Sequence, residues 1–278
     1  MNIVKNKILD RNLQKPILLD YYHLKPANKI PVVIFAHGYK GFKDWGAWDL
    51  MGQAFANAGF CFIKFNFSHN GGTIDNPIDF PDLESFGNNN YSKEVQDLND
   101  VIEWSTNQLS DLIDVNNIFL LGHSRAGGIT TLVASQNDKV KKLITLAGVS
   151  DYKTRFPTGK ALNKWEIDKV FYVKNGRTQQ EMPHYYQFFE DFIYNEEKLT
   201  IKIAAQKLTI PHLIIHGQND ETVNLQEGRQ LHKWNKNSQL HIIREANHTL
   251  GAVHPWSSIY LPKHLKQAIQ CSINFYKK

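Results

Sequence analysis

Short apolar runs alternate with segments of mixed polarity along most of the chain. The apolar runs predict buried strands at 30–36, 60–67, 117–123, 140–149, 211–217 and 239–245. The segments between and after them predict helices at 45–58, 92–109, 125–136, 224–235 and 263–276. Residues 1–24 predict two short strands that pair in an antiparallel manner.

The alternation of strand and helix predicts a parallel sheet with helices on both faces. In such sheets, ligand sites form beyond the carboxyl ends of the strands. Four residues follow predicted strands closely, namely Gly38, Ser124, Asp220 and His248. The pattern therefore gathers these four positions at one edge of the sheet.

Two segments break the alternation. Residues 68–90 are rich in Asn, Gly, Asp and Pro and predict a long loop. Residues 151–208, after the sixth predicted strand, are far longer than the roughly 10–12 residues that a crossover needs. We interpret 151–208 as a cap inserted into a catalytic domain that comprises 1–150 and 209–278, because such inserts exclude water and shape the substrate pocket.

The insert at 151–208 has its own pattern. It predicts a hairpin around 170–173 with a turn at 174–176, and a helical stretch at 185–194 that is rich in aromatic residues. Aromatic side chains of a small insert either form its own core or line the pocket beneath it. We expect at least one ring to line the pocket.

The segment 118–128 carries the clearest chemical signal. The apolar run 118–121 ends at Gly122, and Ser124 and Ala126 follow before residues that favour a helix. A strand, a tight turn and a helix in this order form a nucleophile elbow, which lifts a serine hydroxyl clear of the sheet edge. The N-terminus of the helix stabilises nearby negative charge. Ser124 is therefore the candidate nucleophile.

A serine nucleophile needs two partners. Its hydroxyl is a poor nucleophile at neutral pH, so a neutral imidazole has to accept its proton, and a buried carboxylate has to orient that imidazole. Asp220 and His248 both follow predicted strands downstream of Ser124, and the interval between them leaves room for one helix and one strand. We predict that His248 is the base and that Asp220 orients it.

The attack on a carbonyl creates an oxyanion, which needs two preorganised N–H donors. One donor is expected from the residue after the nucleophile, which is Arg125. The other is expected from the loop after an earlier strand, and the backbone N–H of Tyr39 has the right position.

Rival candidates exist for both partners of Ser124. The rival base is His254, and the rival acids are Asp151 and Glu221. The position directly after a strand favours His248 as the base and Asp220 as the acid over all three. His123, within the elbow, is interpreted as structural.

The composition narrows the class of protein. The net charge is +5, but the basic residues are scattered, so nucleic-acid binding is not expected.

Cys61 and Cys271 are too isolated for a disulfide framework, which suits a reducing compartment. No apolar run reaches the ~18 residues of a membrane helix and no secretory pattern begins the sequence, so we expect a cytoplasmic protein without membrane contact. The histidines lack metal-ligand spacing, so neither metal nor cofactor is expected.

Together these motifs resemble the α/β-hydrolase superfamily. The resemblance rests on residues 37–38, 122–127, 216–220 and 247–248, and on the order Ser, Asp, His along the chain. The chain is similar to dienelactone-hydrolase-like and serine-aminopeptidase-like hydrolases, to bacterial cinnamoyl and feruloyl esterases, and to the catalytic domain of prolyl oligopeptidases. The resemblance implies an eight-stranded, mostly parallel sheet with helices on both faces and a cap after the sixth strand. Dienelactone hydrolases proper use cysteine, so a serine at 124 argues against that activity.

Three functions fit this sequence. The first is hydrolysis of a small-molecule carboxylic ester through an acyl-enzyme. The second is a serine peptidase that uses the same residues and binds the substrate N-terminus through carboxylates of the insert, for which Glu190, Asp191, Glu196 and Glu197 are available, although surface solvation explains them equally well. The third is a non-catalytic binding protein of the same fold, against which the complete set of catalytic residue types argues. The oligomeric state does not follow from the sequence.

Overall fold

Ten β-strands and ten α-helices make up the structure, a computed structural model that describes all of residues 1–278. The strands are β1 (Asn2–Arg11), β2 (Gln14–His23), β3 (Ile30–Ala36), β4 (Cys61–Phe65), β5 (Ile113–His123), β6 (Val140–Leu146), β7 (Val170–Lys174), β8 (Glu181–Tyr185), β9 (His212–Gly217) and β10 (Ser238–Ile243). The helices are α1 (Trp48–Asn57), α2 (Leu83–Gly87), α3 (Tyr91–Gln108), α4 (Arg125–Ala134), α5 (Lys160–Asp168), α6 (Gln187–Tyr194), α7 (Glu196–Leu199), α8 (Ile201–Lys207), α9 (Leu225–Trp234) and α10 (Lys263–Lys277). None of these helices combines the length and the apolar character that crossing a membrane requires.

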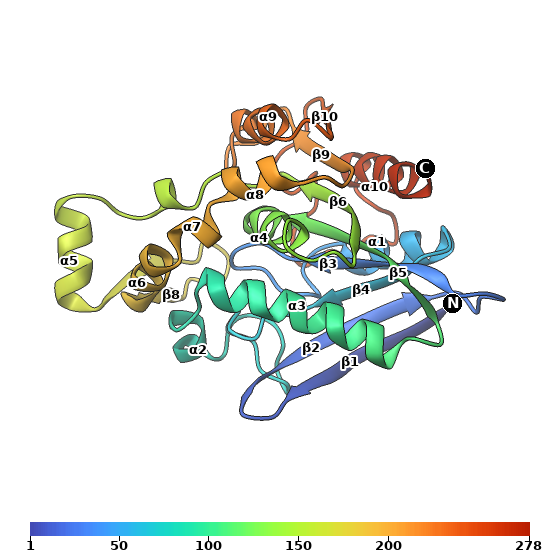
Figure 1. Cartoon of the computed structure of the whole chain (residues 1–278). Coiled ribbons are helices and arrows are strands. Elements are labelled where there is room, and N and C mark those ends of the chain that lie inside the picture. Colours follow the sequence, from blue (N-terminus) through green and yellow to red (C-terminus); the bar gives the residue numbers. More distant parts are fainter.

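Eight strands form one sheet in the order β1-β2-β4-β3-β5-β6-β9-β10 (Figure 1). β1 and β2 pair in an antiparallel manner, and β2 runs antiparallel to β4. From β4 to β10, each strand is parallel to its neighbours. The predicted fold class, a mostly parallel eight-stranded sheet of the α/β-hydrolase type, is therefore confirmed.

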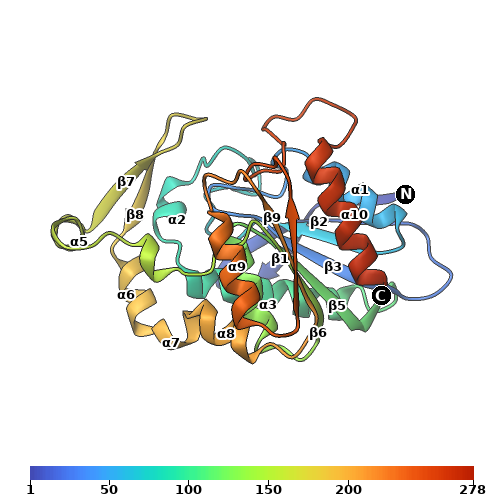
Figure 2. The ribbon, with the colours of Figure 1, turned by 90° about the horizontal axis from the view of Figure 1, so that it is seen from above.

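Helices cover both faces of the sheet. α3, α4, α8 and α9 pack in series on one face, and α1 and α10 cover the other (Figure 2). The central strand β3 supplies both cores, because successive side chains of a strand point to opposite faces. Val32 and Ile34 belong to the first core, and Val33 and Phe35 belong to the second. Burial on both faces explains why apolar residues dominate the inner strands.

The helix expected at 92–109 is α3, and its start is fixed by a cap. The Asn90 side chain accepts a hydrogen bond from the backbone N–H of Lys93, which satisfies one of the free donors at the helix N-terminus. The long loop expected at 68–90 contains the short helix α2, which Asp82 caps in the same way. The loop composition concealed α2 because it spans barely more than one turn.

The strand expected at 117–123 is longer in the structure. β5 begins at Ile113, which is fully buried and pairs with Ile30 of β3. Three of residues 114–117 are Asp or Asn, and all four are partly or fully exposed, so the apolar pattern concealed this extension. The carboxyl end of β5, which positions the candidate nucleophile, lies where the sequence predicts it.

The insert at 151–208 contains α5, the hairpin of β7 and β8, and helices α6 to α8. The hairpin expected around 170–173 is present, with its two strands antiparallel. α8 packs against α4 and α9 and so lies in the helix layer on the sheet, whereas α5 and the hairpin project away from the sheet (Figures 1 and 2).

Aromatic rings join the insert to the main body. Phe156 packs against Trp165, Phe188 and Phe192, with ring centroids 5.0–6.2 Å apart. Tyr91 of α3 packs edge-on against Phe188 at 4.7 Å. These rings belong to the same continuous core as the sheet face, so this part of the insert is anchored by buried apolar surface.

Candidate active site

The serine predicted as nucleophile lies on a strained turn between β5 and α4. Its backbone angles are φ 57° and ψ −122°, a conformation that residues other than glycine rarely adopt. The Ser124 N–H donates to the Leu146 carbonyl, and the Ser124 carbonyl accepts from the Gly127 N–H, each at 2.9 Å. A Cβ at Gly122 would lie 2.4 Å from the Ala126 carbonyl oxygen, so the turn requires glycine there. This is the geometry of a nucleophile elbow.

The structure brings the three predicted residues together in one hydrogen-bonded chain. The Oγ of Ser124 lies 3.0 Å from Nε2 of His248. The Nδ1 of His248 lies 2.8 Å from Oδ2 of Asp220. With its proton on Nδ1, the imidazole donates to Asp220 and leaves Nε2 free to accept the serine proton. The arrangement can therefore activate a serine hydroxyl.

The surroundings of Asp220 keep its carboxylate ionised. Its Oδ1 accepts the backbone N–H groups of Thr222 and Val223 at 2.9 and 2.8 Å. Burial by itself would raise the pKa of Asp220, but contacts with His216, His248 and the Val223 N–H hold that pKa well below its usual range. An ionised carboxylate orients the imidazole and stabilises the imidazolium that forms during attack.

The rival candidates for base and acid, His254, Asp151 and Glu221, lie in other environments. The Nδ1 of His254 accepts the Gly46 N–H at 3.0 Å. The carboxylate of Asp151 accepts a backbone N–H two residues further on at 2.7 Å. Glu221 is exposed. None of the three is hydrogen-bonded to Ser124 or to its imidazole partner.

His123, in the elbow, supports the loop that carries the candidate base. Its Nε2 lies 3.1 Å from the main-chain carbonyl oxygen of His248. Burial lowers the pKa of His123 to about 3, so the ring is neutral and donates one proton to that carbonyl. The residue is structural, as the sequence suggested.

The two residues predicted to supply backbone donors, Tyr39 and Arg125, line the larger hollow beside Ser124. The Tyr39 N–H makes no hydrogen bond within the chain. Arg125 is the first residue of α4, where an N–H has no partner inside its own helix. The loop of Tyr39 approaches closely because Gly38 has no side chain: a Cβ there would lie 2.8 Å from the Cβ of Ser124. Such donors fit the requirements of an oxyanion hole.

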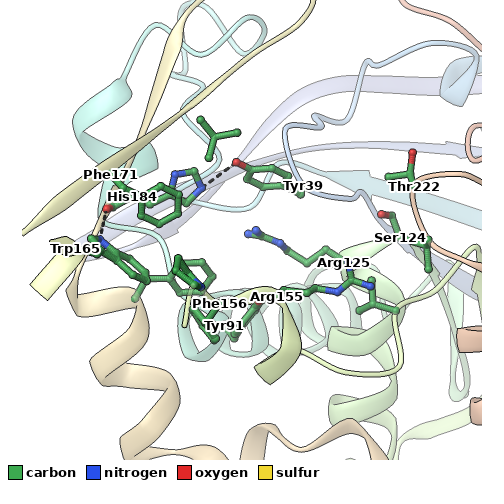
Figure 3. Close-up of a pocket in the computed structure, with 15 residues that line it drawn as sticks. Tyr39, Tyr91, Ser124, Arg125, Arg155, Phe156, Trp165, Phe171, His184 and Thr222 are labelled. Atoms are coloured by element: carbon green, nitrogen blue, oxygen red, sulfur yellow. Dashed lines mark hydrogen bonds between the residues drawn. The ribbon is translucent and has the colours of Figure 1, made fainter. Parts of the chain in front are cut away.

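A cavity of about 480 Å³ opens at Ser124, between the sheet edge and the insert (Figure 3). The main body contributes Tyr39, Tyr91, Ser124, Arg125, Val149, Thr222 and Val223 to its lining. The insert contributes Arg155, Phe156, Pro157, Trp165, Phe171, Val173, His184 and Phe188. Its volume and apolar lining suit a small-molecule ligand. The expectation that aromatic rings of the insert line the pocket is confirmed.

A smaller hollow of about 120 Å³ also adjoins Ser124. It is lined by His37, Gly38, Tyr39, Lys40, Gly41, Trp45, Trp48, His123, Ser124, His248 and Thr249. His248 lines this hollow but not the larger cavity. Ser124 therefore lies between two spaces of unequal size, and the imidazole of His248 faces the smaller one.

The side chain of Tyr39 links the main body to the insert. Its hydroxyl lies 2.9 Å from Nε2 of His184 on β8 (Figure 3). The His184 main chain is held in turn, because the Trp165 indole N–H donates to its carbonyl at 2.8 Å. Burial and the charge of Arg125 lower the pKa of His184 to about 3. The neutral ring donates from Nδ1 to the Met182 carbonyl at 3.2 Å, so Nε2 accepts the tyrosine proton.

No carboxylate lines the larger cavity. The insert carboxylates that could have bound a substrate N-terminus are engaged elsewhere or exposed. Glu196 forms an ion pair with a lysine at 2.7 Å, and Asp191 accepts a hydrogen bond from a serine of α3 at 2.9 Å. Glu190 and Glu197 are exposed and do not line the cavity.

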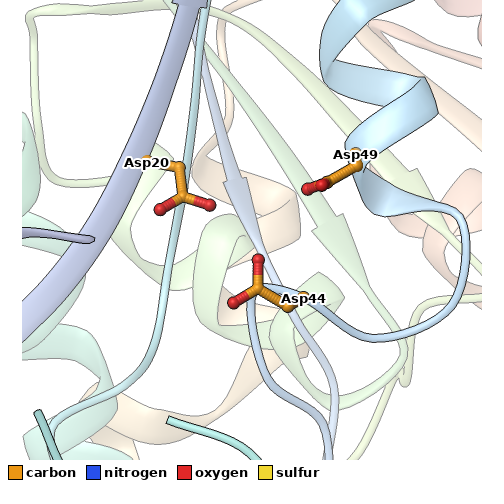
Figure 4. Close-up of side chains that lie close together, drawn as sticks. All are labelled: Asp20, Asp44 and Asp49. Carbon is orange, nitrogen blue, oxygen red and sulfur yellow. The ribbon is translucent and has the colours of Figure 1, made fainter. Parts of the chain in front are cut away.

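Three other carboxylates converge away from this site (Figure 4). Oxygen atoms of Asp20, Asp44 and Asp49 lie within 4.8 Å of one another. The ammonium group of Lys64 lies among them, 3.1 Å from Asp20 and 2.5 Å from Asp44, and it also contacts Asp49. Lys43 adds a second ammonium, 2.9 Å from Asp20. The chain thus supplies its own cations at this cluster, and we assign no metal to it.

Several side chains of the site escaped the sequence analysis. Arg125 was predicted for its backbone N–H, whereas its guanidinium also enters the cavity. The carboxylate that pairs with it, Glu94, lies on the buried face of α3, and a charged residue at an apolar position of a helix is a signal that could have marked it. Arg155 and His184 lie in the insert, whose packing no periodic pattern reveals.

The chain matches one protein family over most of its length. The family described as the prolyl oligopeptidase family matches residues 51–271, a range that includes Ser124, Asp220 and His248. No curated protein sequence matches the chain significantly.

Solved structures share the fold. Est1E from Butyrivibrio proteoclasticus is 17% identical with a TM-score of 0.69, over 98% of this chain and 97% of that one. The esterase domain of a Rhodothermus marinus protein is 15% identical with a TM-score of 0.65, over 100% and 97%. The acylaminoacyl peptidase of Pyrococcus horikoshii is 20% identical with a TM-score of 0.65, over 99% of this chain but 41% of that one. At such identities the likeness is one of fold.

Proposed function

Because the chain belongs to the prolyl oligopeptidase family and is a serine hydrolase of the α/β-hydrolase superfamily, we propose that it cleaves carboxylic esters through an acyl-enzyme on Ser124. The observation that carries the proposal is the hydrogen-bonded chain from Ser124 through His248 to Asp220, with Ser124 at the edge of a largely apolar cavity. These three side chains have the mutual geometry that nucleophilic serine catalysis requires.

The first half of the reaction acylates the serine. Ser124 Oγ attacks the ester carbonyl carbon while its proton moves to Nε2 of His248, and Asp220 stabilises the imidazolium. The carbonyl oxygen becomes an oxyanion, which accepts hydrogen bonds from the N–H groups of Tyr39 and Arg125. As the bond to the alcohol oxygen breaks, His248 returns its proton to that oxygen and the alcohol leaves.

The second half releases the acid. A water molecule attacks the acyl carbon while His248 accepts one of its protons. The bond to Ser124 Oγ then breaks, and the imidazolium returns the proton to the serine oxygen. The net change adds one water to the ester and restores the enzyme.

The two hollows suggest where each part of the ester lies. His248 has to reach the leaving oxygen, and it lines only the hollow of about 120 Å³. The alcohol part therefore fits this smaller space. The acyl part fits the cavity of about 480 Å³ under the insert. We expect a bulky acyl group and a small alcohol.

An ester is favoured over a peptide with a free N-terminus. Recognition of an ammonium group needs a carboxylate, and none lines the cavity. An amide also needs its leaving nitrogen protonated, and the small hollow beside His248 leaves little room for a peptide chain. Both observations argue for a small alcohol as leaving group.

The contact between His184 and Tyr39 gives a prediction about catalysis. Replacing His184 with phenylalanine removes the acceptor of the Tyr39 hydroxyl and lets the loop that carries the Tyr39 N–H shift. We expect kcat to fall roughly 10- to 100-fold with little change in KM, because an oxyanion donor acts mainly in the transition state. Steady-state kinetics on one p-nitrophenyl ester measures both constants.

The matched control is His184→Gln, whose amide oxygen can still accept the tyrosine proton. This variant is expected to keep most of the wild-type kcat. Equal kcat values for wild type and a folded His184→Phe protein would show that the contact does not position the donor. A rise in KM alone would assign His184 to substrate binding instead.

A fluorophosphonate probe tests the proposed function directly. We expect the probe to label Ser124, as located by tryptic mapping, and we expect turnover across a panel of p-nitrophenyl esters from acetate to decanoate. Probe labelling reports an activated serine regardless of substrate. The dependence of kcat/KM on chain length then measures how much of the cavity the acyl group fills.

Each alternative outcome has a distinct meaning. Labelling of Ser124 without ester turnover, together with cleavage of acylaminoacyl or aminoacyl anilides, would replace the esterase with a peptidase. Absence of labelling in a folded sample would contradict the proposal and favour a binding protein.

A further inference from the structure

The charged groups that line the larger cavity all carry the same sign. Arg125 and Arg155 are its only charged lining residues. Their acidic partners, Glu94 and Glu227, pair with them from outside the lining. A ligand in this cavity therefore meets guanidinium groups and aromatic rings but no carboxylate.

Arg125 is the guanidinium that is positioned to bind a ligand. Figure 3 shows its side chain extending into the cavity below Tyr39, whose ring centroid lies 4.2 Å from the guanidinium carbon. Its carbon also lies 5.4 Å from the Tyr91 ring and 5.5 Å from the Phe188 ring. The ring faces attract the guanidinium and hold it in place. They offer no oxygen atom to accept its hydrogen bonds.

Most donors of Arg125 are unused. A guanidinium carries five N–H donors. Within the chain, the guanidinium of Arg125 makes one hydrogen bond, from Nη1 to Glu94 Oε1, at a long 3.3 Å. The remaining donors are available to a group in the cavity, although the Arg125 side chain is only 16% exposed. A planar fork of this kind matches a carboxylate.

Arg155 is a poorer candidate. Its Nη2 lies 2.5 Å from Glu227, and its Nε donates to the Asp151 carbonyl at 3.1 Å. Its side chain is 35% exposed, so water screens its charge. These contacts engage the Nε and Nη2 donors of Arg155 with other parts of the chain.

We propose that the preferred substrate is an ester whose acyl group is apolar and ends in a carboxylate, and that Arg125 binds this carboxylate. The inference rests on the proposed ester hydrolysis and names the substrate class for that same site. An apolar cavity of roughly 150 Å³ accommodates one benzene ring, so about 480 Å³ holds a ring with substituents at both ends. The aromatic lining packs against the apolar part, and Arg125 selects the charged end.

A pair of rigid esters tests this class. Methyl 4-carboxybenzoate and methyl 4-carbamoylbenzoate have nearly the same shape, but only the first carries a negative charge. The para arrangement also prevents the carboxylate from attacking its own ester. We expect wild-type kcat/KM to be at least about tenfold higher for the carboxylate ester. The same two compounds, used as competitors of p-nitrophenyl acetate hydrolysis, should differ by a similar factor in inhibition constant.

Variants assign the preference to one residue. The double variant Arg125→Gln with Glu94→Gln removes both charges of the pair, and its preference ratio is expected to fall to about one. The control is Arg155→Gln, which should keep the wild-type ratio. Circular dichroism checks that each variant folds. If the double variant does not fold, the wild-type ratio and the inhibition constants still decide the substrate class.

The outcomes separate this inference from the proposed function. Equal or inverted wild-type ratios, with p-nitrophenyl esters still hydrolysed, would overturn the carboxylate subsite and leave the esterase intact. Loss of the preference in Arg155→Gln instead would move the subsite away from Arg125. Absence of probe labelling at Ser124 and of all ester turnover would be a failure of the proposed function itself.

Discussion

Replacing Ser124 with alanine is expected to lower kcat on the order of 10⁴-fold or more while the fold persists. The Oγ of Ser124 has one hydrogen-bond partner, Nε2 of His248. Its removal deletes the attacking oxygen, and the partly exposed imidazole can bond to water instead, so the cost in stability is small. Hydrolysis of p-nitrophenyl acetate measures the loss of turnover. Thermal unfolding followed by circular dichroism measures the stability, which should stay close to that of the wild type.

A pair of histidine variants serves as the control for this experiment. His248→Gln should lose activity to a similar extent as Ser124→Ala, because the nucleophile and its base act as a unit. His254→Gln should retain activity within about tenfold, because His254 accepts the Gly46 N–H and does not contact the nucleophile. A fully active Ser124→Ala protein would contradict the assignment. A His254 variant as inactive as the His248 variant would move the base.

The inner strands could be predicted because burial leaves a strong signal. β3, β4, β6 and β9 lie inside the sheet, between the helix layers, so apolar residues dominate their sequences. The ends of the strands were harder to predict from the sequence. β5 extends back to Ile113 through a mostly polar segment, and β6 stops at Leu146, before Ala147 takes a positive φ of 49°. Such ends depend on local hydrogen bonds that an apolar pattern does not record.

The meeting of Ser124, His248 and Asp220 could be predicted because the topology of a parallel sheet gathers strand ends. Ser124, Asp220 and His248 each follow a strand that is parallel to the others, so a spacing argument sufficed. The larger cavity beside Ser124 could not be predicted in the same way. It is built from side chains of the insert, such as Trp165 and His184, whose positions depend on contacts between segments far apart in the sequence.

The buried ionic cluster shows another limit of the sequence pattern. Lys64 is the one charged residue of the fully buried strand β4, and the apolar pattern around it does not reveal its partners. Its partners come from β2, from the loop after β3 and from α1, which supply Asp20, Asp44 and Asp49. Both Lys64 and Asp20 have side chains with 0% exposure. Only the folded topology brings these charges together, and only their mutual pairing makes their burial tolerable.

Replacing Lys64 with methionine is expected to lower the free energy of unfolding by about 3–5 kcal/mol. The substitution removes the ammonium but leaves Asp20 buried, so one carboxylate loses a counterion that water cannot replace. Lys43 remains 2.9 Å from Asp20 and compensates for only part of the charge. Urea denaturation at pH 7 measures the difference between wild type and variant.

The matched control is Lys5→Met, which removes an ammonium from the rim of the same cluster. The Lys5 side chain is 38% exposed, so its loss should cost less than about 1 kcal/mol.

The pH dependence of stability gives a second check. Although burial acts in the opposite direction, the charges of Lys64 and Lys43 lower the pKa of Asp44 to about 2. A lowered carboxyl pKa contributes stability above the unfolded value of about 3.9, and this stability is lost as the pH falls toward 2.

The difference between wild type and Lys64→Met should therefore be largest near neutral pH and shrink in acid, where protonation neutralises the carboxylates that the variant leaves unpaired. A difference that stays constant from pH 7 to pH 3 would indicate that Lys64 acts through the packing of its aliphatic stem. A variant as stable as the wild type at pH 7 would show that its ammonium is not the counterion of Asp20.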